Sequence, residues 1–225
     1  MTDLALLPAV EIESAASPDA ALIFLHGLGD DGHGWSDMVP ALRMPHDLRV
    51  RYVFPHAPEM PVTINGGYVM PAWYDLYDAD FNSRADLGGV RTSRTHVDRL
   101  IAREIERGVP ASRIVIGGFS QGGAVALYSG LRHREKLAGI VALSCYLIDA
   151  ESLTSEASPA NRATPIFMAH GRDDEVVRFE WGEASGKRLA AAGWPVEWHA
   201  YPMPHSAVIE EIEEIGRFVA RALAE

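Results

Sequence analysis

Residues 113–131 read RIVIGGFSQGGAVALYSGL, and this stretch decides the fold. The branched apolar run at 114–116 predicts a buried strand, and residues 124–127 predict a helix. Between them, residues 118–122 (GFSQG) form a G-x-S-x-G pattern where the strand turns into the helix. In such a turn the serine has a strained backbone that exposes its hydroxyl, and the glycines let strand and helix approach closely. The pattern therefore predicts that Ser120 is a nucleophile.

Glycine-rich turns between a strand and a helix can instead bind phosphate. A P-loop requires a Lys followed by Ser or Thr, and no such pair follows this turn. A helix that starts just after Ser120 would direct unpaired N–H groups and the positive end of its dipole toward a developing oxyanion. The residues therefore favour nucleophilic catalysis over phosphate binding.

The composition limits the classes of function. The chain has 225 residues, a net charge of -11 and one cysteine, Cys145. We expect a single domain covering residues 1–225, a cytoplasmic location, and either a monomer or a homodimer. The negative charge disfavours nucleic acid as a partner, and no apolar run is long enough for membrane insertion.

Strand and helix patterns alternate along the chain. Strands are expected at residues 9–13, 21–26, 48–54, 137–144, 165–170 and 195–201. Helices are expected at residues 35–44, 90–108, 178–192 and 207–223. This alternation predicts an α/β fold, with a mainly parallel central sheet and helices on both faces.

Two further segments carry local signals. Residues 55–87 contain several prolines and are expected to be irregular, with a hairpin signal at Asn65-Gly66. The last helix carries acidic residues that we expect on its solvated surface: Glu210, Glu211, Glu213 and Glu214.

A serine nucleophile needs a general base and an acid that orients it. His205 lies in the loop after the strand at 195–201, and an acidic cluster follows the strand at 165–170. Serine, acid and histidine then occur in the order that a serine hydrolase built on a G-x-S-x-G turn requires. His205 is expected to be the base, whereas His26 and His170 end strands before a glycine and are expected to be structural. Spacing alone leaves four candidate acids: Asp149, Asp173, Asp174 and Glu175.

Five motifs occur in one order: HGLGDDGHGW, TINGGYVMPAWYDL, GGFSQGGAVALY, HGRDDEVV and MPHS. Together they resemble the acyl-protein thioesterase/carboxylesterase (phospholipase/carboxylesterase) family of α/β-hydrolases. The resemblance implies an α/β-hydrolase domain with no large cap. It implies that Asp174 is the catalytic acid, because the family's acid is the fourth residue after the histidine of its H-G motif. It also implies oxyanion donors at the backbone N–H groups of Leu28 and Gln121, and places Trp73 beside the substrate groove.

Apolar residues on loops at the same sheet edge suggest a groove for an acyl chain. We expect substrate contacts from Val62, Met70, Trp73, Tyr74 and Met203, with Leu28, Trp35 and Met60 nearby. Tyr146-Leu147 is followed by Ile148 where the family often has proline, a difference that affects loop shape and acyl-chain preference rather than the triad.

The expected function is hydrolysis of carboxylic esters of short to medium acyl chains, without metal or other cofactor. A small-molecule ester or thioester is the expected substrate, and lysophospholipid and acylated protein are alternatives. A metal-dependent hydrolase using His26, Asp30, Asp31 and His33 is a rival interpretation, but their spacing matches no known ligand pattern. A binding module without activity on the same fold is a second rival.

Overall fold

A seven-stranded sheet forms the centre of the computed structural model, which describes residues 4–78 and 86–224. In spatial order its strands are β1 (Ala9–Glu13), β3 (Val50–Pro55), β2 (Ala20–Leu25), β6 (Ile114–Phe119), β7 (Gly139–Leu143), β8 (Ile166–Gly171) and β9 (Val196–Tyr201). All neighbouring strands are parallel except β1, which pairs with β3 in the antiparallel direction. The expectation of a mainly parallel sheet is therefore confirmed.

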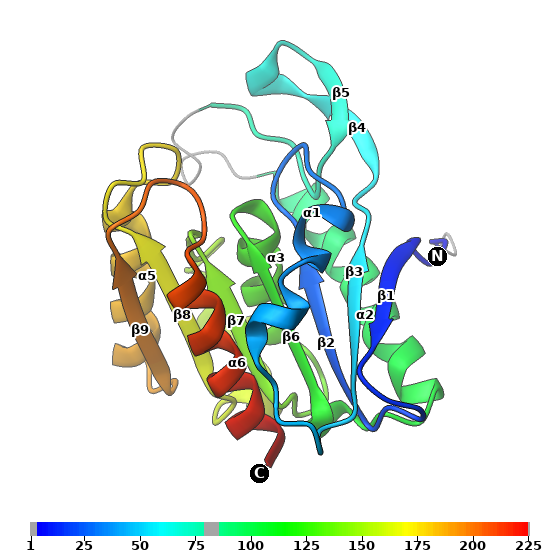
Figure 1. Cartoon of the computed structure of the whole chain (residues 1–225). Coiled ribbons are helices and arrows are strands. Elements are labelled where there is room, and N and C mark those ends of the chain that lie inside the picture. Colours follow the sequence, from blue (N-terminus) through cyan, green and yellow to red (C-terminus); the bar gives the residue numbers. More distant parts are fainter. Residues whose placement is uncertain (1–3, 79–85, 225) are drawn as a thin grey trace.

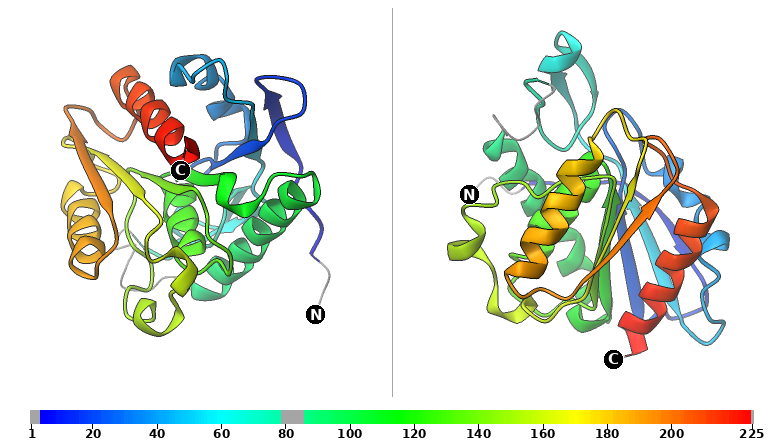
Figure 2. Two further views of the ribbon diagram at one scale, coloured as in Figure 1. Left: turned by 90° about the horizontal axis from the view of Figure 1, so that it is seen from below. Right: turned by 90° about the vertical axis from the view of Figure 1, so that its left-hand side faces the viewer.

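Helices cover both faces of this sheet (Figures 1 and 2). They are α1 (His33–Ser36), α2 (Leu87–Glu106), α3 (Gln121–Gly130), α4 (Leu153–Glu156), α5 (Phe179–Ala191) and α6 (Ile209–Ala224). One apolar core lies under α2, α3 and α5, and a second lies between the opposite face and α6. Between β7 and β8 the chain forms only α4 and the 3-10 helix Pro159–Asn161, so no large cap interrupts the described fold there.

The segment after α1 differs from its prediction. A helix was expected over residues 35–44, but α1 ends at Ser36 and a separate 3-10 helix covers Val39–Leu42. Pro40 lacks a backbone N–H and is accommodated near the start of this short helix rather than inside a longer one. The 3-10 helix packs against α6, where a Cβ at Gly216 would lie 1.8 Å from the carbonyl oxygen of Leu42.

A second correction concerns α6. Glu211 was expected on the solvated surface, but its side chain is completely buried. It lies one helical turn before Ile215, which faces the core, so at 100° per residue it falls at the edge of the apolar face.

A hairpin projects above the carboxyl edge of the parallel strands (Figure 1). Strands β4 (Glu59–Val62) and β5 (Tyr68–Pro71) pair in the antiparallel direction, joined by the 3-10 helix Thr63–Asn65 and two glycines with positive φ. The Asn-Gly signal therefore marked a real turn. The rest of the segment expected to be irregular includes residues 79–85, which lie outside the described residues.

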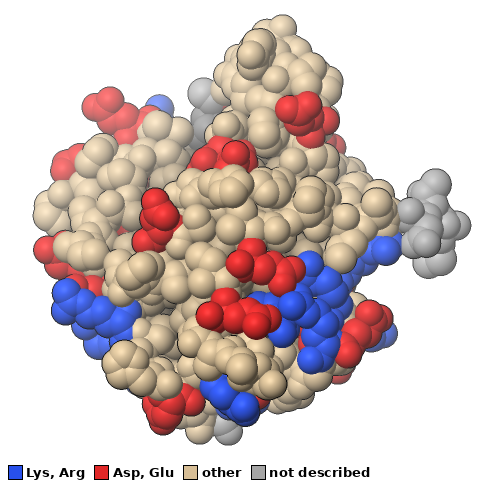
Figure 3. Space-filling view, turned by 45° about the vertical axis from the view of Figure 1, so that its right-hand side comes forward, with Lys and Arg blue, Asp and Glu red and all other residues tan. Residues whose placement is uncertain are grey.

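Charged side chains lie mainly on the body below the hairpin (Figure 3). Within residues 59–71 only Glu59 is charged. On the β1–β3–α2 side, the buried carboxylate of Glu104 pairs with Arg51, and Arg103 and Arg107 pair with Glu11. These pairs join the antiparallel edge strand to α2. None of the described helices combines the length and the hydrophobicity required to cross a membrane.

Candidate active site

Ser120 lies in a sharp turn between β6 and α3. Its φ of 54° and ψ of -122° fall in a region that non-glycine residues rarely adopt. The flanking glycines are sterically required, because a Cβ at Gly118 would lie 2.5 Å from the carbonyl carbon of Gly122, and one at Gly122 would lie 2.3 Å from the carbonyl oxygen of His26. The predicted strand–turn–helix geometry is present.

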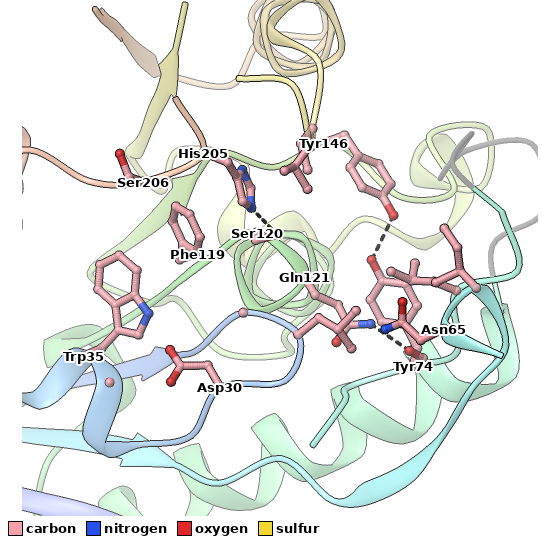
Figure 4. A pocket seen from close by; sticks show the side chains of 17 residues that line it. Asp30, Trp35, Asn65, Tyr74, Phe119, Ser120, Gln121, Tyr146, His205 and Ser206 are labelled. Carbon is pink, nitrogen blue, oxygen red and sulfur yellow. Dashed lines mark hydrogen bonds between the residues drawn. The ribbon is translucent and has the colours of Figure 1, made fainter. Parts of the chain in front are cut away.

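A chain of two hydrogen bonds links three side chains from different loops. His205 Nε2 lies 2.9 Å from Ser120 Oγ (Figure 4). On the other side of the same ring, His205 Nδ1 lies 2.7 Å from Asp174 Oδ2. His205 follows β9 and Asp174 follows β8, so the carboxyl ends of three parallel strands bring these residues together. With Nδ1–H donating to the carboxylate, Nε2 can accept the Ser120 proton.

Asp174 is held as a buried carboxylate. Its Oδ1 accepts hydrogen bonds from the backbone N–H groups of Val176 and Val177, at 2.9 and 2.8 Å. Burial opposes ionisation, but the hydrogen bonds from His170, His205 and Val177 outweigh it and hold the pKa of Asp174 well below its ordinary value. Asp174 is therefore available as an anion to orient His205.

The other candidate acids lie elsewhere. Asp173 and Glu175 are exposed, and Asp149 Oδ2 accepts a hydrogen bond from Ser152. Of the four acids left open by spacing, Asp174 is the one hydrogen-bonded to His205.

The glycine-rich loop after β2 lies against Ser120. A Cβ at Gly27 would lie 3.5 Å from Ser120 Cβ, and Leu28 lines the same cavity as Ser120. Gln121 is the first residue of α3, so its N–H has no partner within the helix. These positions suit two backbone donors directed at an oxyanion.

His26 holds this loop in place. Its Nδ1 donates to the carbonyl of Gly27 at 2.7 Å, and its Nε2 accepts from the N–H of Ala57 at 3.0 Å. Burial lowers the pKa of His26, in keeping with a neutral ring in this tautomer. The structural role expected for His26 agrees with these contacts.

The side chain of Gln121 fixes the segment after the hairpin. Its Oε1 accepts from the N–H of Trp73 at 2.9 Å, and its Nε2 donates to the carbonyl of Tyr74 at 2.7 Å. Trp73 in turn donates from Nε1 to the carbonyl of His26 at 2.9 Å. Trp73 is thus buried and braces the glycine-rich loop after β2.

A cavity of about 520 Å³ opens beside Ser120 and His205 (Figure 4). Its lining includes Leu28, Trp35, Tyr74 and Tyr146.

The cavity differs from the groove expected from sequence, because four expected contact residues do not line it: Val62, Met70, Trp73 and Met203. Val62, Trp73 and Met203 are buried in packing. Met70 belongs to the hairpin, and its sulfur faces Gly29. Apolar character identified loop residues near the site but not the direction of their side chains.

The rival metal site is not assembled. Both ring nitrogens of His26 are engaged by the backbone, and Asp31 accepts from the N–H of His33. Across residues 4–78 and 86–224, no group of three His, Cys, Asp or Glu side chains is placed to hold a metal ion.

The family model, the related sequences and the solved structures that resemble this chain all indicate the same family. The sequence model of a family described as Phospholipase/Carboxylesterase matches residues 7–223. "Acyl-protein thioesterase 1" of Neurospora crassa is 44% identical over 99% of this chain and 95% of its own length. The crystal structure of Zea mays acyl-protein thioesterase 2 is 30% identical, with a TM-score of 0.84, over 96% of this chain and 99% of that chain. The crystal structure of Arabidopsis thaliana SOBER1 is 34% identical, with a TM-score of 0.85, over 91% of this chain and 99% of that chain.

Proposed function

The chain belongs to the phospholipase/carboxylesterase family and is a serine hydrolase, and we propose that Ser120, His205 and Asp174 form its catalytic triad. The observation that carries this proposal is the hydrogen-bonded series Ser120–His205–Asp174 at the wall of a cavity. The strained backbone of Ser120 supports the same role, because it holds the hydroxyl at the carboxyl edge of the sheet.

In the first half of the reaction, Ser120 Oγ attacks the carbonyl carbon of the substrate while His205 Nε2 takes the hydroxyl proton. Asp174 stabilises the resulting imidazolium through Nδ1–H. The carbonyl oxygen becomes an oxyanion and accepts hydrogen bonds from the N–H groups of Leu28 and Gln121. Collapse of this intermediate breaks the bond to the leaving group, which receives its proton from His205 and departs.

In the second half, water replaces the leaving group. His205 removes a proton from the water as it attacks the acyl-serine, and the proton then returns to Ser120 as the acid is released. Each step uses side chains, backbone amides and water, so the proposed mechanism requires no metal or cofactor. We also propose that residues 1–225 form one domain, an arrangement supported by the single sheet that carries all three triad loops.

The proposed substrates are carboxylic esters with short to medium acyl chains. Tyr74, Ile64, Leu76 and Val177 supply apolar surface to the cavity, and each methylene buried there contributes about 0.8 kcal/mol. A cavity of this size is within the range of small-molecule sites and is limited in the chain length it can hold.

A second candidate is hydrolysis of thioesters on acylated proteins. It is supported by relatives more than 40% identical, from Neurospora crassa and Yarrowia lipolytica, that are named acyl-protein thioesterase 1. The same attack by Ser120 serves an ester or a thioester, because both present a carbonyl carbon with a leaving group.

The test is a series of p-nitrophenyl esters from acetate to palmitate, run beside matching thioesters and a lysophospholipid. Catalytic efficiency should rise with chain length and then fall among the longer esters. Efficiency that is flat from acetate onward would contradict an acyl-binding cavity. A strong preference for the palmitoyl thioester would favour the protein-deacylating candidate, and preference for the lysophospholipid would favour a lysophospholipase.

A further inference from the structure

Two tyrosine hydroxyls meet across one part of the cavity. Tyr74 Oη and Tyr146 Oη lie 2.9 Å apart, although the residues are separated by 72 positions in the chain. Both side chains are buried and both line the cavity. Figure 4 shows this pair on one side of Ser120, with Trp35 and Asp30 on the other side. Ser120 therefore lies between two parts of the cavity lining, which we call the tyrosine arm and the Asp30 arm.

The tyrosine arm is suited to hydrocarbon. Figure 4 shows the neutral amide of Asn65 beside Tyr74. The neighbouring Ile64 and Leu76 also line the cavity and are joined by a hydrogen bond from Ile64 N–H to the Leu76 carbonyl at 2.8 Å. The arm on the other side of Ser120 contains the carboxylate of Asp30. Among the described residues that line the cavity, Asp30 is the one Asp, Glu, Lys or Arg, whereas the polar groups beside Tyr74 are neutral. An acyl chain that enters the tyrosine arm therefore does not remove a carboxylate from water.

Both tyrosines are attached to well-anchored backbone. The Tyr74 carbonyl accepts from Gln121, and the neighbouring Trp73 carbonyl accepts from Ser93. On the other side, the N–H of Leu147, next to Tyr146, donates to Ser185 Oγ at 2.9 Å. These contacts hold the two hydroxyls in position, and separating them would require movement of at least one anchored segment.

The pair remains a neutral hydrogen bond under physiological conditions. Burial raises the pKa of both phenols, that of Tyr74 with a further contribution from Tyr146. Pushing the rings apart would therefore break a buried hydrogen bond, which is unfavourable because no bulk water replaces the lost partner.

We propose that the Tyr74–Tyr146 hydroxyl pair is the chain-length stop of the tyrosine arm. The proposal rests on the proposed function, since it requires that the acyl group bound to Ser120 enters this arm. Chains that end before the pair gain about fourfold in affinity for each buried methylene. Chains that reach the pair must displace it, and the cost of breaking this buried hydrogen bond then exceeds the gain from further methylenes, so affinity falls.

Two kinds of variant separate the hydroxyls from the rings. Tyr146→Ala removes the stop entirely, and the double variant Tyr74→Phe/Tyr146→Phe removes only the hydrogen bond. Tyr128→Phe is the matched control, because Tyr128 is buried in the same core but does not line the cavity. Circular dichroism and thermal melting establish that each protein is folded, and the double variant decides the question if Tyr146→Ala does not fold.

The measurement is kcat/KM across the even-numbered acyl esters from acetate to palmitate. In the wild-type protein it should rise to a maximum and then fall. Tyr146→Ala should move the maximum by at least one step toward longer chains. For the double variant, the informative quantity is kcat/KM for the first ester longer than the optimal one, divided by kcat/KM for the optimal ester. The double variant should increase this ratio by about tenfold, mainly through a lower KM for the longer ester. Tyr128→Phe should leave both the maximum and the ratio in place.

An unchanged maximum and ratio in the folded Tyr variants would overturn the proposal, as would an equal change in Tyr128→Phe. A wild-type profile that rises to palmitate without a maximum would also overturn it. Failure of the proposed function has a different result: no acyl ester or thioester would be hydrolysed in a Ser120-dependent manner, whatever the chain length.

Discussion

His170 contacts the proposed catalytic acid: its Nε2 lies 3.3 Å from Asp174 Oδ2, the oxygen that also accepts from His205. The same His170 nitrogen lies 2.8 Å from the carbonyl oxygen of Val177. The ring packs closely on α5, where a Cβ at Gly182 would lie 2.2 Å from its Nδ1. His170 is therefore placed to fix the loop that carries Asp174.

We predict that His170→Ala lowers kcat by about tenfold or more with little change in KM, because Asp174 loses a hydrogen bond that acts through His205 and not on bound substrate. His170→Gln, which keeps a side-chain N–H, should retain more activity. His46→Ala, at an exposed histidine, is the control. Steady-state kinetics decide the matter, and equal kcat in His170→Ala and wild type would exclude a positioning role.

Substitution of the two adjacent aspartates, Asp173 and Asp174, should have very different effects on turnover. Asp174→Asn should lower turnover by about 10⁴, because the carboxylate that sets the tautomer of His205 is lost. Asp173→Asn should have a far smaller effect, because Asp173 is exposed. Initial rates of ester hydrolysis by both variants test this, and the reverse ranking would assign the acid to Asp173.

Glu211 should make the protein less stable as pH rises. Burial raises its pKa to about 8 in the folded state, whereas the ordinary value is 4.5. Between these values the folded state holds a proton that the unfolded state has released, so the free energy of unfolding falls across this window. Each pH unit contributes about 1.4 kcal/mol at most, and the total is on the order of a few kcal/mol.

Urea unfolding between pH 4.5 and 8.5 measures this effect. Glu211→Gln keeps the shape of the side chain without its titration, so its stability should decline less over that range. Glu210→Gln is the matched control, since Glu210 is exposed on the same helical turn. Parallel pH profiles for wild type and Glu211→Gln would contradict the prediction.

Local sequence was sufficient to predict the structure where a residue pattern constrains the backbone. The G-x-S-x-G turn around Ser120 was predictable because two glycines are required by close backbone contacts. The buried strands were predictable from their apolar runs, and the Asn-Gly turn from its glycine conformations. The order of Ser120, an acid and His205 was predictable because parallel strands present their following loops at one edge.

Local sequence was insufficient to predict side-chain contacts and burial where segments distant in the chain determine them. The Tyr74–Tyr146 bond joins residues from opposite sides of the cavity, and neither neighbourhood in the chain signals the other. His170 was expected to be structural because it ends a strand before a glycine, but its contact with Asp174 could not be predicted, since only the folded loop brings the two side chains together. Glu211 was expected in solvent because the sequence pattern places it off the apolar face of the helix, whereas α6 packs that position against the body.

The most direct test of the catalytic assignment combines hydrolysis with active-site labelling of Ser120→Ala. Ser155→Ala, at an exposed serine, is the control. A fluorophosphonate probe should label wild type and Ser155→Ala on the peptide containing Ser120, and it should not label folded Ser120→Ala. Hydrolysis of p-nitrophenyl butyrate by Ser120→Ala should fall by about 10⁴ or more, because triad members act as a unit. Activity within tenfold of wild type, or labelling that persists in Ser120→Ala, would contradict the assignment of Ser120 as the nucleophile.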